Sequence, residues 1–260
     1  MNVVVCVKQI PDPAAPQSLD AENRLNRSGK LILDEADSYG VEVALRLVEA
    51  AGEGEVSLVS MGEATDVTGI RSALAMGAQR ATVVADPLLK GADALTTAKV
   101  LAAVISRETP DLILAATESS DGYTGTLPVQ LAQLLDLPAL TFATSVVVEG
   151  DTVVVHRQTE AGYDEVAATL PAVVTVTAGV VEPRYATFKG IMAAKSRPVN
   201  VVSIADLGLD PSNLDPRQDI VAVETATTKS AGEKYVDDGE GAQRILAFLE
   251  QIKIVSGSAT

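Results

Sequence analysis

The chain has 260 residues, of which 35 are acidic and 20 are basic, so its formal charge is −15. Because nucleic acids and anionic membranes would repel this charge, neither is expected as a general partner. Hydrophobic residues make up 47% but aromatic residues only 3%, so the core must consist of Val, Leu, Ile and Ala. The single cysteine, Cys6, and the single histidine, His156, exclude an intramolecular disulfide and a His/Cys metal cluster, and we predict no metal site.

The first apolar run, VVVCV at 3–7, is five residues long and is followed by Lys8 and Pro11. It is far too short for the core of a signal peptide or for a membrane span. No arginine-rich leader precedes it. We therefore expect a strand here, a protein that does not insert into a membrane, and either a bacterial cytoplasmic location or a form that has already been processed.

Up to about residue 140, short Val- and Leu-rich runs alternate with stretches of helical periodicity. In the first such stretch, from about Ser38, Val41, Ala44, Leu45 and Val48 recur at helical spacing. This alternation is typical of βα units and predicts an α/β fold with a doubly wound, mostly parallel sheet. The predicted strands are 3–7, 55–61, 80–85 and 111–116, and the predicted helices lie at about 38–52, 66–77, with Asp66 as N-cap, 95–105 and 127–135.

The pattern changes after Leu140. Alternating strands flank turn signals at 149–151 and 161–162, which predicts an antiparallel β meander that returns to a final buried strand, AVVTVT at 172–177. From Gly179 the periodicity fades until a short C-terminal helix, GAQRILAFLEQI. We therefore expect an α/β domain over 1–200 and an extended C-terminal arm with its helix over 201–260.

The segment TESSDGYTGT, residues 117–126, leaves the fourth predicted strand and enters a helix. In an open parallel sheet, ligands bind beyond the carboxyl ends of the strands. Hydroxyl groups, glycines that let backbone N–H groups come close, and a helix N-terminus are the features of a phosphate cradle. An ordinary polar loop is the alternative, since the chain has neither a Walker A nor a Gly-x-Gly-x-x-Gly motif.

No set of catalytic residues emerges from the sequence. His156 lies on the alternating strand VVVHRQ, on the face opposite Val153 and Val155, which favours a solvated histidine over a general base. Cys6 lies inside a buried strand and is expected to pack rather than to react. The residues are those of a binding protein rather than an enzyme.

The segment EPRYATFKGIMAAKSRP, residues 182–198, is basic within an acidic chain. It holds four basic residues and one acidic residue. Taken alone, this pattern favours a solvated helix start over a docking site.

The stretch LPAVVTVTAGVVEPRYATFKGIMAAKSRPV resembles the β subunits of electron transfer flavoproteins. The most specific agreement is Glu-Pro-Arg-Tyr-Ala-Thr followed by an apolar residue and then by Ile-Met-x-Ala-Lys. VCVKQIPD, IRSALAMGAQRA, HRQTEAGYDEV and TKSAGEKY agree as well. The resemblance therefore covers nearly the whole chain, from Met1 to about Lys253.

The resemblance implies an adenine-nucleotide-binding, Rossmann-like three-layer fold. In that family the β subunit binds AMP as a structural piece and forms a heterodimer with an α subunit, which holds most of a redox-active FAD. These heterodimers carry electrons from acyl-CoA dehydrogenases and related flavoenzymes of fatty acid β-oxidation to a membrane quinone oxidoreductase. The AMP contacts would fall on Cys6, Asp34, Glu35, Ala36, Asp37, Met61, Ala116, Thr117, Glu118, Ser119, Ser120, Asp121, Gly122, Tyr123, Thr124, Gly125 and Thr126.

In the family, the stretch similar to 182–198 is a recognition loop that docks on partner dehydrogenases and inserts one apolar side chain into a hydrophobic pocket. That anchor corresponds to Phe188, and its basic neighbours would steer an acidic partner. With the resemblance, docking becomes the preferred interpretation. The docking residues would be Arg184, Tyr185, Ala186, Thr187, Phe188, Lys189, Gly190, Ile191, Met192 and Lys195.

The resemblance leaves a second possibility open, the related bifurcating type, in which the β site binds a second FAD and the assembly accepts a hydride from NADH. The basic recognition loop favours the first possibility. A nucleotide-hydrolysing or adenylating enzyme is disfavoured, because the segment KQIPDPAAP after the first strand contains no glycine.

Overall fold

The computed structural model of the chain describes residues 1–63, 65–224, 232 and 234–255. The chain divides into two units, Met1–Val221 and Ala222–Thr260. The first unit contains the sheets and five of the helices that the structure describes. The second contains one described helix.

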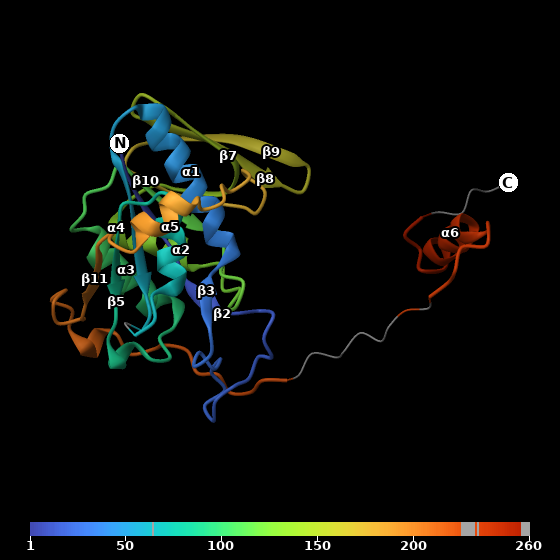
Figure 1. Cartoon of the computed structure of the whole chain (residues 1–260), viewed down its shortest axis with the longest axis horizontal. Helices are drawn as coiled ribbons and strands as arrows, with labels where there is room; N and C mark the ends of the chain where they lie inside the picture. The colour runs from blue at the N-terminus through green and yellow to red at the C-terminus, as the bar shows by residue number, and fades with distance from the viewer. Residues whose placement is uncertain (64, 225–231, 233, 256–260) are drawn as a thin grey trace. The chain divides into compact units, whose positions relative to one another are not determined.

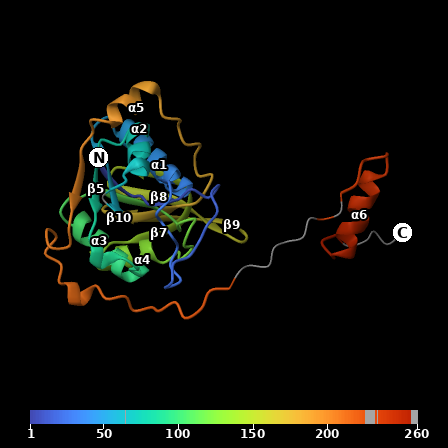
Figure 2. The same cartoon turned by 60° about the horizontal axis from the view of Figure 1, so that its bottom comes forward.

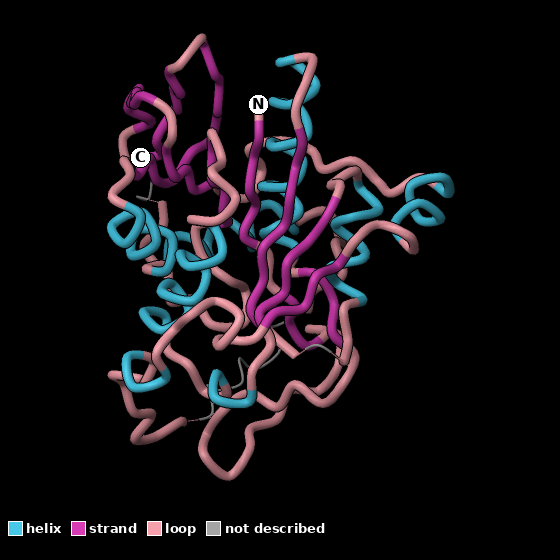
Figure 3. The backbone as a smooth tube through the Cα atoms, turned by 90° about the vertical axis from the view of Figure 1, so that its left-hand side faces the viewer, coloured by secondary structure: helices cyan, strands magenta, loops and turns pink. Residues whose placement is uncertain are grey.

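The first unit is built around a nine-stranded sheet formed by the described residues (Figures 1 and 3). The strands from β11 to β7 run parallel to their neighbours, while β8 and β9 are antiparallel. This confirms the predicted doubly wound, mostly parallel sheet with its antiparallel meander. In spatial order the strands are β11 (Val199–Val202), β5 (Arg80–Val84), β4 (Glu55–Met61), β1 (Asn2–Cys6), β6 (Leu112–Ala116), β10 (Ala172–Val176), β7 (Ala139–Glu149), β8 (Thr152–Thr159) and β9 (Gly162–Thr169).

Helices lie on both sides of this sheet, so the unit has three layers (Figure 2). Residue alternation in β1 separates the two cores: Val3 and Val5 pack in the core shared with α1 and α2, while Val4 and Cys6 pack in the core shared with α3 and α4. The helices are α1 (Glu35–Ala51), α2 (Thr68–Met76) and α5 (Phe188–Ala194) on one side, and α3 (Ala94–Ile105) and α4 (Leu127–Leu135) on the other.

Local sequence explains where the first helices begin. Asp34 is the N-cap of α1, and its carboxylate accepts the Ala36 N–H at 3.2 Å, so the helix begins before the predicted Ser38. The predicted cap of α2, Asp66, lies just before the observed N-cap position, and its carboxylate still accepts the Thr68 N–H at 2.8 Å.

Several short elements escape the sequence patterns. They are β11 and the strands β2 (Gln9–Pro11) and β3 (Leu31–Leu33), the last two of which form a two-stranded antiparallel sheet. β11 pairs with β5, and Leu207 and Leu214 beyond it are buried in the core. The first unit therefore continues to Val221, past the boundary expected at residue 200.

The second unit contains α6 (Gly241–Gln251), where the sequence predicts a helix. None of the α6 residues is buried. Most of the TKSAGEKY motif lies outside the described residues. Among the helices that the structure describes, none has the length and apolar character needed to cross a bilayer.

Candidate functional site

The strand order reverses at β1: the chain adds β4 and β5 on one side of it, and then β6 and β10 on the other. Open α/β sheets bind ligands in the crevice outside the carboxyl ends of the strands at such a point. Lys8 follows β1, and residues 117–126, called here the phosphate loop, connect β6 to α4. Two segments far apart in sequence therefore meet where a ligand is expected.

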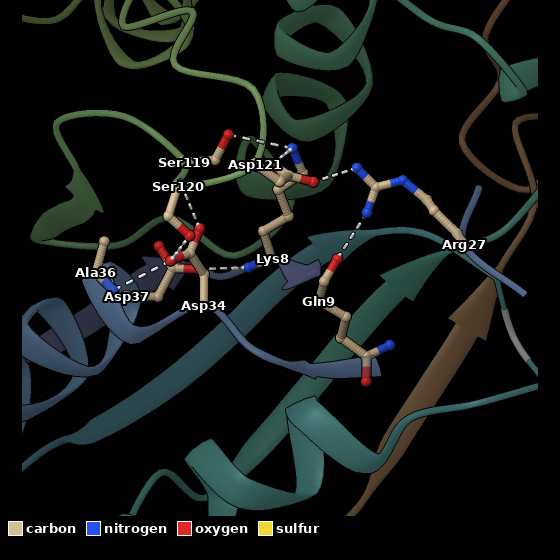
Figure 4. Close-up of polar contacts among 9 residues, drawn as sticks. All are labelled: Lys8, Gln9, Arg27, Asp34, Ala36, Asp37, Ser119, Ser120 and Asp121. Atoms are coloured by element: carbon tan, nitrogen blue, oxygen red, sulfur yellow. Dashed lines mark hydrogen bonds and ion pairs between the residues drawn. The ribbon is translucent and has the colours of Figure 1, made fainter. Parts of the chain in front are cut away.

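Two basic side chains meet on the carboxylate of Asp121, in the phosphate loop (Figure 4). Lys8 Nζ donates to Asp121 Oδ1 at 2.6 Å and to Ser119 Oγ at 3.2 Å, while Arg27 Nη2 pairs with Asp121 Oδ2. Burial acts to raise the pKa of Asp121, but the hydrogen bond and charge of Lys8 and the charge of Arg27 outweigh it and hold this pKa below its ordinary value. The loop is therefore held against cations from two distant segments.

A second contact fixes the same loop to the start of α1. The Ser120 N–H and the Ser120 hydroxyl both donate to the Asp34 carboxylate, each at 2.8 Å. Asp34 is fully buried and is also the α1 cap, so its carboxylate joins the helix start to the loop (Figure 4). Hydrogen bonding of this kind is what a buried carboxylate requires.

Two further predicted residues are buried beside these contacts. Asp37 accepts the Lys8 N–H at 2.6 Å, and burial raises the pKa of Asp37 well above its ordinary value although this hydrogen bond lowers it. Burial, with a smaller effect from Asp37, raises the pKa of the Cys6 thiol to about 12. A thiol with so high a pKa is not a nucleophile at neutral pH, and Cys6 packs in the core as expected.

The second half of the phosphate loop contains two residues in the left-handed region and leads into the start of α4. Tyr123 and Gly125 have φ angles of +47° and +66°. Thr126, the N-cap of α4, makes no side-chain cap hydrogen bond, and the first N–H groups of a helix have no acceptor within the helix. A phosphate group supplies such acceptors and opposes the positive end of the helix dipole. The first N–H groups of α4 therefore could donate to a phosphate.

The remaining residues predicted for this site surround its centre without all facing it. Met61 ends β4 and packs against the core of α3 and α4. Thr117 Oγ1 lies 3.2 Å from Thr175 Oγ1 and donates to Val176 O at 3.1 Å, which ties it to β10. Ala116 is buried at the end of β6. The exposed members are Glu35, Glu118, Ser120, Gly122, Tyr123, Thr124 and Thr126.

Sequence reasoning does not assign Lys8 and Arg27 to this site. The rule that ligands bind at strand ends does point to residues 8–13, which follow the predicted strand 3–7, but the residues assigned to the nucleotide do not include Lys8. Arg27 comes from the loop between β2 and β3, where it also donates to Gln9 O at 3.1 Å. No sequence pattern marks Arg27.

The basic segment 182–198, called here the docking segment, contains α5 and a group of exposed apolar side chains. Thr187 caps α5, with its hydroxyl accepting the Gly190 N–H at 3.1 Å. We call the exposed group the docking face; it consists of Tyr185 (90% exposed), Phe188 (79%), Met192 (49%) and Ile191 (46%). Exposed apolar groups of this kind mark interaction sites.

The other predicted docking residues differ in how they are placed. Lys189 and Lys195 are exposed, as the docking interpretation requires. Arg184 instead pairs with Glu42 and Glu49 of α1. Ala186 packs against the core, and a Cβ at Gly190 would lie 2.3 Å from the Ala75 carbonyl oxygen, so the backbone of α5 approaches α2 closely there.

His156 is placed as the strand pattern predicts. Its ring stacks on Tyr163 with the ring centroids 4.2 Å apart, and its Nε2 lies 3.7 Å from a Glu165 carboxylate oxygen. Val153 and Val155, on the opposite face of β8, are buried. The histidine is therefore a surface strand residue.

Comparison with known proteins gives a consistent result. The family model of the electron transfer flavoprotein domain matches residues 23–207. The chain is 36% identical to the electron transfer flavoprotein subunit beta of Mycobacterium tuberculosis strain H37Rv, over 98% of this chain and 99% of the relative. It is 31% identical to that of Thermoanaerobacterium thermosaccharolyticum, over 98% and 100%. It is also 33% identical to the caffeyl-CoA reductase-Etf complex subunit CarD of Acetobacterium woodii, over 84% and 86%.

Proposed function

This chain belongs to the electron transfer flavoprotein family, among its β subunits, and from that premise we propose that it pairs with an α subunit that holds most of an FAD while it binds a structural AMP itself. The heterodimer would carry electrons from acyl-CoA dehydrogenases and related flavoenzymes to a membrane quinone oxidoreductase. The observation that carries the AMP assignment is the phosphate loop at the point where the strand order reverses.

The residues of this chain perform binding rather than a chemical step. Asp34 and Lys8 hold the phosphate loop in place, and the uncapped start of α4 would donate N–H groups to the AMP phosphate. The FAD of the partner subunit would supply the redox chemistry. Some residues that the resemblance assigns to AMP make other contacts. Thr117, for example, donates to Val176 O and would support the loop.

We propose the docking segment as the contact to the partner dehydrogenases, with Phe188 as its anchor. An exposed aromatic side chain that enters a pocket of a partner is a common form of interface hot spot. Lys189 and Lys195 are the exposed cations that would favour an acidic partner. The helix α6 of the second unit, Ala222–Thr260, would pack on the α subunit. We also propose a bacterial cytoplasmic location, which the presence of a single cysteine supports.

The nucleotide content of the heterodimer tests this function. The chain is coexpressed with its α partner, the purified complex is denatured, and the released nucleotides are separated and counted. Equal amounts of FAD and AMP are expected, with the yellow colour following the α subunit when the chains are separated. A complex that contains FAD but no nucleotide attributable to this chain would contradict the AMP assignment.

A second candidate function is favoured by one relative. The Acetobacterium woodii protein is named as a subunit of a caffeyl-CoA reductase-Etf complex, in which the flavoprotein belongs to a larger enzyme. In that case the site of this chain would hold a second FAD and the assembly would accept a hydride from NADH. The same measurement separates the candidates, because two FAD and no AMP per complex, with bleaching of the flavin by NADH, would favour the second.

A further inference from the structure

The side chain of Arg184, at the start of the docking segment, is turned toward α1. Its Nε and Nη2 donate to the two carboxylate oxygens of Glu42, at 2.7 and 3.2 Å. Its Nη1 and Nη2 donate to the two carboxylate oxygens of Glu49, at 2.6 and 3.1 Å. The Arg184 main-chain N–H adds a bond to Glu42 at 3.2 Å. One guanidinium therefore makes two bidentate pairs with one helix.

The arrangement requires an arginine. Glu42 and Glu49 are seven residues apart on α1 and so lie on the same face, about two turns apart. The planar guanidinium presents its donors as a rigid fork, whereas a lysine ammonium is a compact charge that cannot bond four carboxylate oxygens in this geometry. The Glu42 side chain is only 2% exposed, so its charge must be paired by groups within the protein.

Further arginines hold the same segment. Arg46 donates to Glu42 at 2.7 Å and to the Glu182 carbonyl oxygen at 3.2 Å. At the other end of the segment, Arg71 of α2 donates to the carbonyl oxygens of Ala194 and Arg197, both at 2.6 Å. The docking segment is thus bonded to α1 before α5 and to α2 after it.

These contacts matter because α5 has only seven residues. A helix shorter than about 12 residues is marginal in water by itself, so its order comes from packing and from anchoring contacts. The docking face lies between the two anchored ends. If the first anchor is lost, Tyr185 and Phe188 are the docking-face residues closest to the freed end.

The local charge excludes a steering role for Arg184. The cations of Arg184 and Arg46 are matched by the carboxylates of Glu42 and Glu49, so this cluster has no net charge at neutral pH. The hydrogen bonds that Arg184 donates to Glu49 and to Glu42 raise the pKa of Arg184, so the guanidinium stays charged. Attraction of an acidic partner therefore falls to the exposed lysines of the segment.

We propose that Arg184 is a positioning residue that fixes the docking face in the conformation in which it binds a partner dehydrogenase. The proposal rests on the docking function proposed above. A face that is ordered before binding loses less conformational entropy on binding. Arg184 thus strengthens docking without touching the partner.

Arg184→Lys tests the proposal because it keeps the charge and removes the fork. The complex with the α subunit is reduced by an acyl-CoA dehydrogenase at varied flavoprotein concentration. We expect KM for the flavoprotein to rise about tenfold, which corresponds to about 1.4 kcal/mol, with kcat within about twofold of wild type and the salt dependence unchanged. Arg24→Lys, which alters an arginine paired with Asp20 and Glu22 elsewhere, is the matched control and should leave KM unchanged. Wild-type kinetics for Arg184→Lys would overturn the proposal.

A double-mutant cycle with Phe188→Ala distinguishes positioning from general destabilisation. If Arg184 acts through the docking face, the lysine variant adds little once Phe188 is gone. Additive effects would overturn the positioning role. If Phe188→Ala alone leaves KM unchanged, the docking function itself is wrong; if only Arg184→Lys is without effect, the docking function stands and the positioning role fails.

Hydrogen exchange gives a readout that does not depend on activity. In Arg184→Lys, amides at 185–194 should exchange faster while those of β1, β4 and β6 keep their protection. Equal acceleration in the sheet would show global destabilisation and contradict the proposal.

Discussion

Phe188 is an apolar residue whose side chain contributes little to the core of the fold. Its side chain is 79% exposed, so Phe188→Ala should leave the melting temperature of the complex nearly unchanged. If the aromatic ring fills a pocket of the dehydrogenase, the substitution should weaken docking by about 2 kcal/mol. The measurement is flavin reduction at limiting dehydrogenase. Leu88→Ala, which shortens another exposed apolar side chain (65%), should not slow the reaction.

Gly125 permits a backbone conformation that other residues reach only with strain. Its φ is +66°, and valine there would also place a β-branched side chain beside the start of α4. We expect Gly125→Val to lose AMP during purification. Gly150→Val is the matched control, because Gly150 has φ +62° in the turn between β7 and β8, with nothing near its Cβ position. Stoichiometric AMP in the Gly125 variant would contradict the site assignment.

The buried carboxylate of Glu42 should contribute to acid sensitivity. Burial acts to raise the pKa of Glu42, but hydrogen bonds from Arg184 and Arg46 outweigh it, so its folded-state pKa lies below the ordinary 4.5. The ion pairs of Glu42 therefore stabilise the folded state fully above pH 4.5. This stabilisation is lost as the pH falls through the lower pKa that Glu42 has in the folded state. Glu42→Gln should cost about 2 kcal/mol at pH 7, since Arg184 remains partly exposed and is screened by solvent.

Urea unfolding between pH 3 and 7 checks this prediction. The Glu42→Gln variant should show a shallower loss of stability in acid than wild type, because one depressed pKa has been removed. Glu49→Gln provides the comparison, since its side chain is 60% exposed and its pair is mostly solvated. Equal effects of the two substitutions would argue against the importance of burial at Glu42.

At the residue scale, the sequence predicts the phosphate loop as a nucleotide site, but it does not predict how this loop is held. Ser120 and Asp34 were both expected at the nucleotide site, and the structure joins them directly. The contact of Arg27 with Asp121 could not be predicted, because it depends on the course of the loop between β2 and β3. Arg184 was expected to face a partner, but its two glutamates lie on a helix more than a hundred residues earlier.

At the scale of elements, the periodicity of apolar residues predicts only those helices and strands that are long enough to bury a regular face. The strands β1, β4, β5 and β6 are buried runs with clear ends, and an amphipathic helix lies between each of them and the next strand of the large sheet along the chain. The short helix α5 and the four-residue strand β11 are too brief for a pattern to emerge. Their order depends on contacts with α2 and β5, which a single-sequence pattern does not contain.

The helix α6 is an element with an apolar stripe that its own unit does not bury. Ile245, Phe248 and Ile252 recur at helical spacing and are 62%, 57% and 44% exposed. If this stripe packs on the α subunit, Phe248→Asp should reduce the yield of heterodimer on a sizing column while the AMP content of the chain is retained. Gln243→Asp, on the same helix, adds an equal charge at a polar position as the control. Unchanged assembly in Phe248→Asp would contradict the proposed contact.

At the scale of the whole chain, the sequence predicted the parallel sheet because right-handed βα connections leave few alternatives once the elements are known. The limit of the first unit was harder to predict. Residues 203–221 have little regular structure, yet Ile204, Leu207 and Leu214 are buried against the core of α3 and α4. Burial of scattered apolar residues leaves no period in the sequence, so the sequence pattern alone assigns this segment to the arm.

The last strand of the nine-stranded sheet, β9, has one neighbour among the described strands. Such a strand is a template for unwanted strand addition between molecules. Asp164 and Glu165 are exposed on β9, so pairing of this strand with the same strand of a second molecule would bring like charges together. We therefore expect these two acidic residues to oppose aggregation, an effect that salt would weaken by screening the charges.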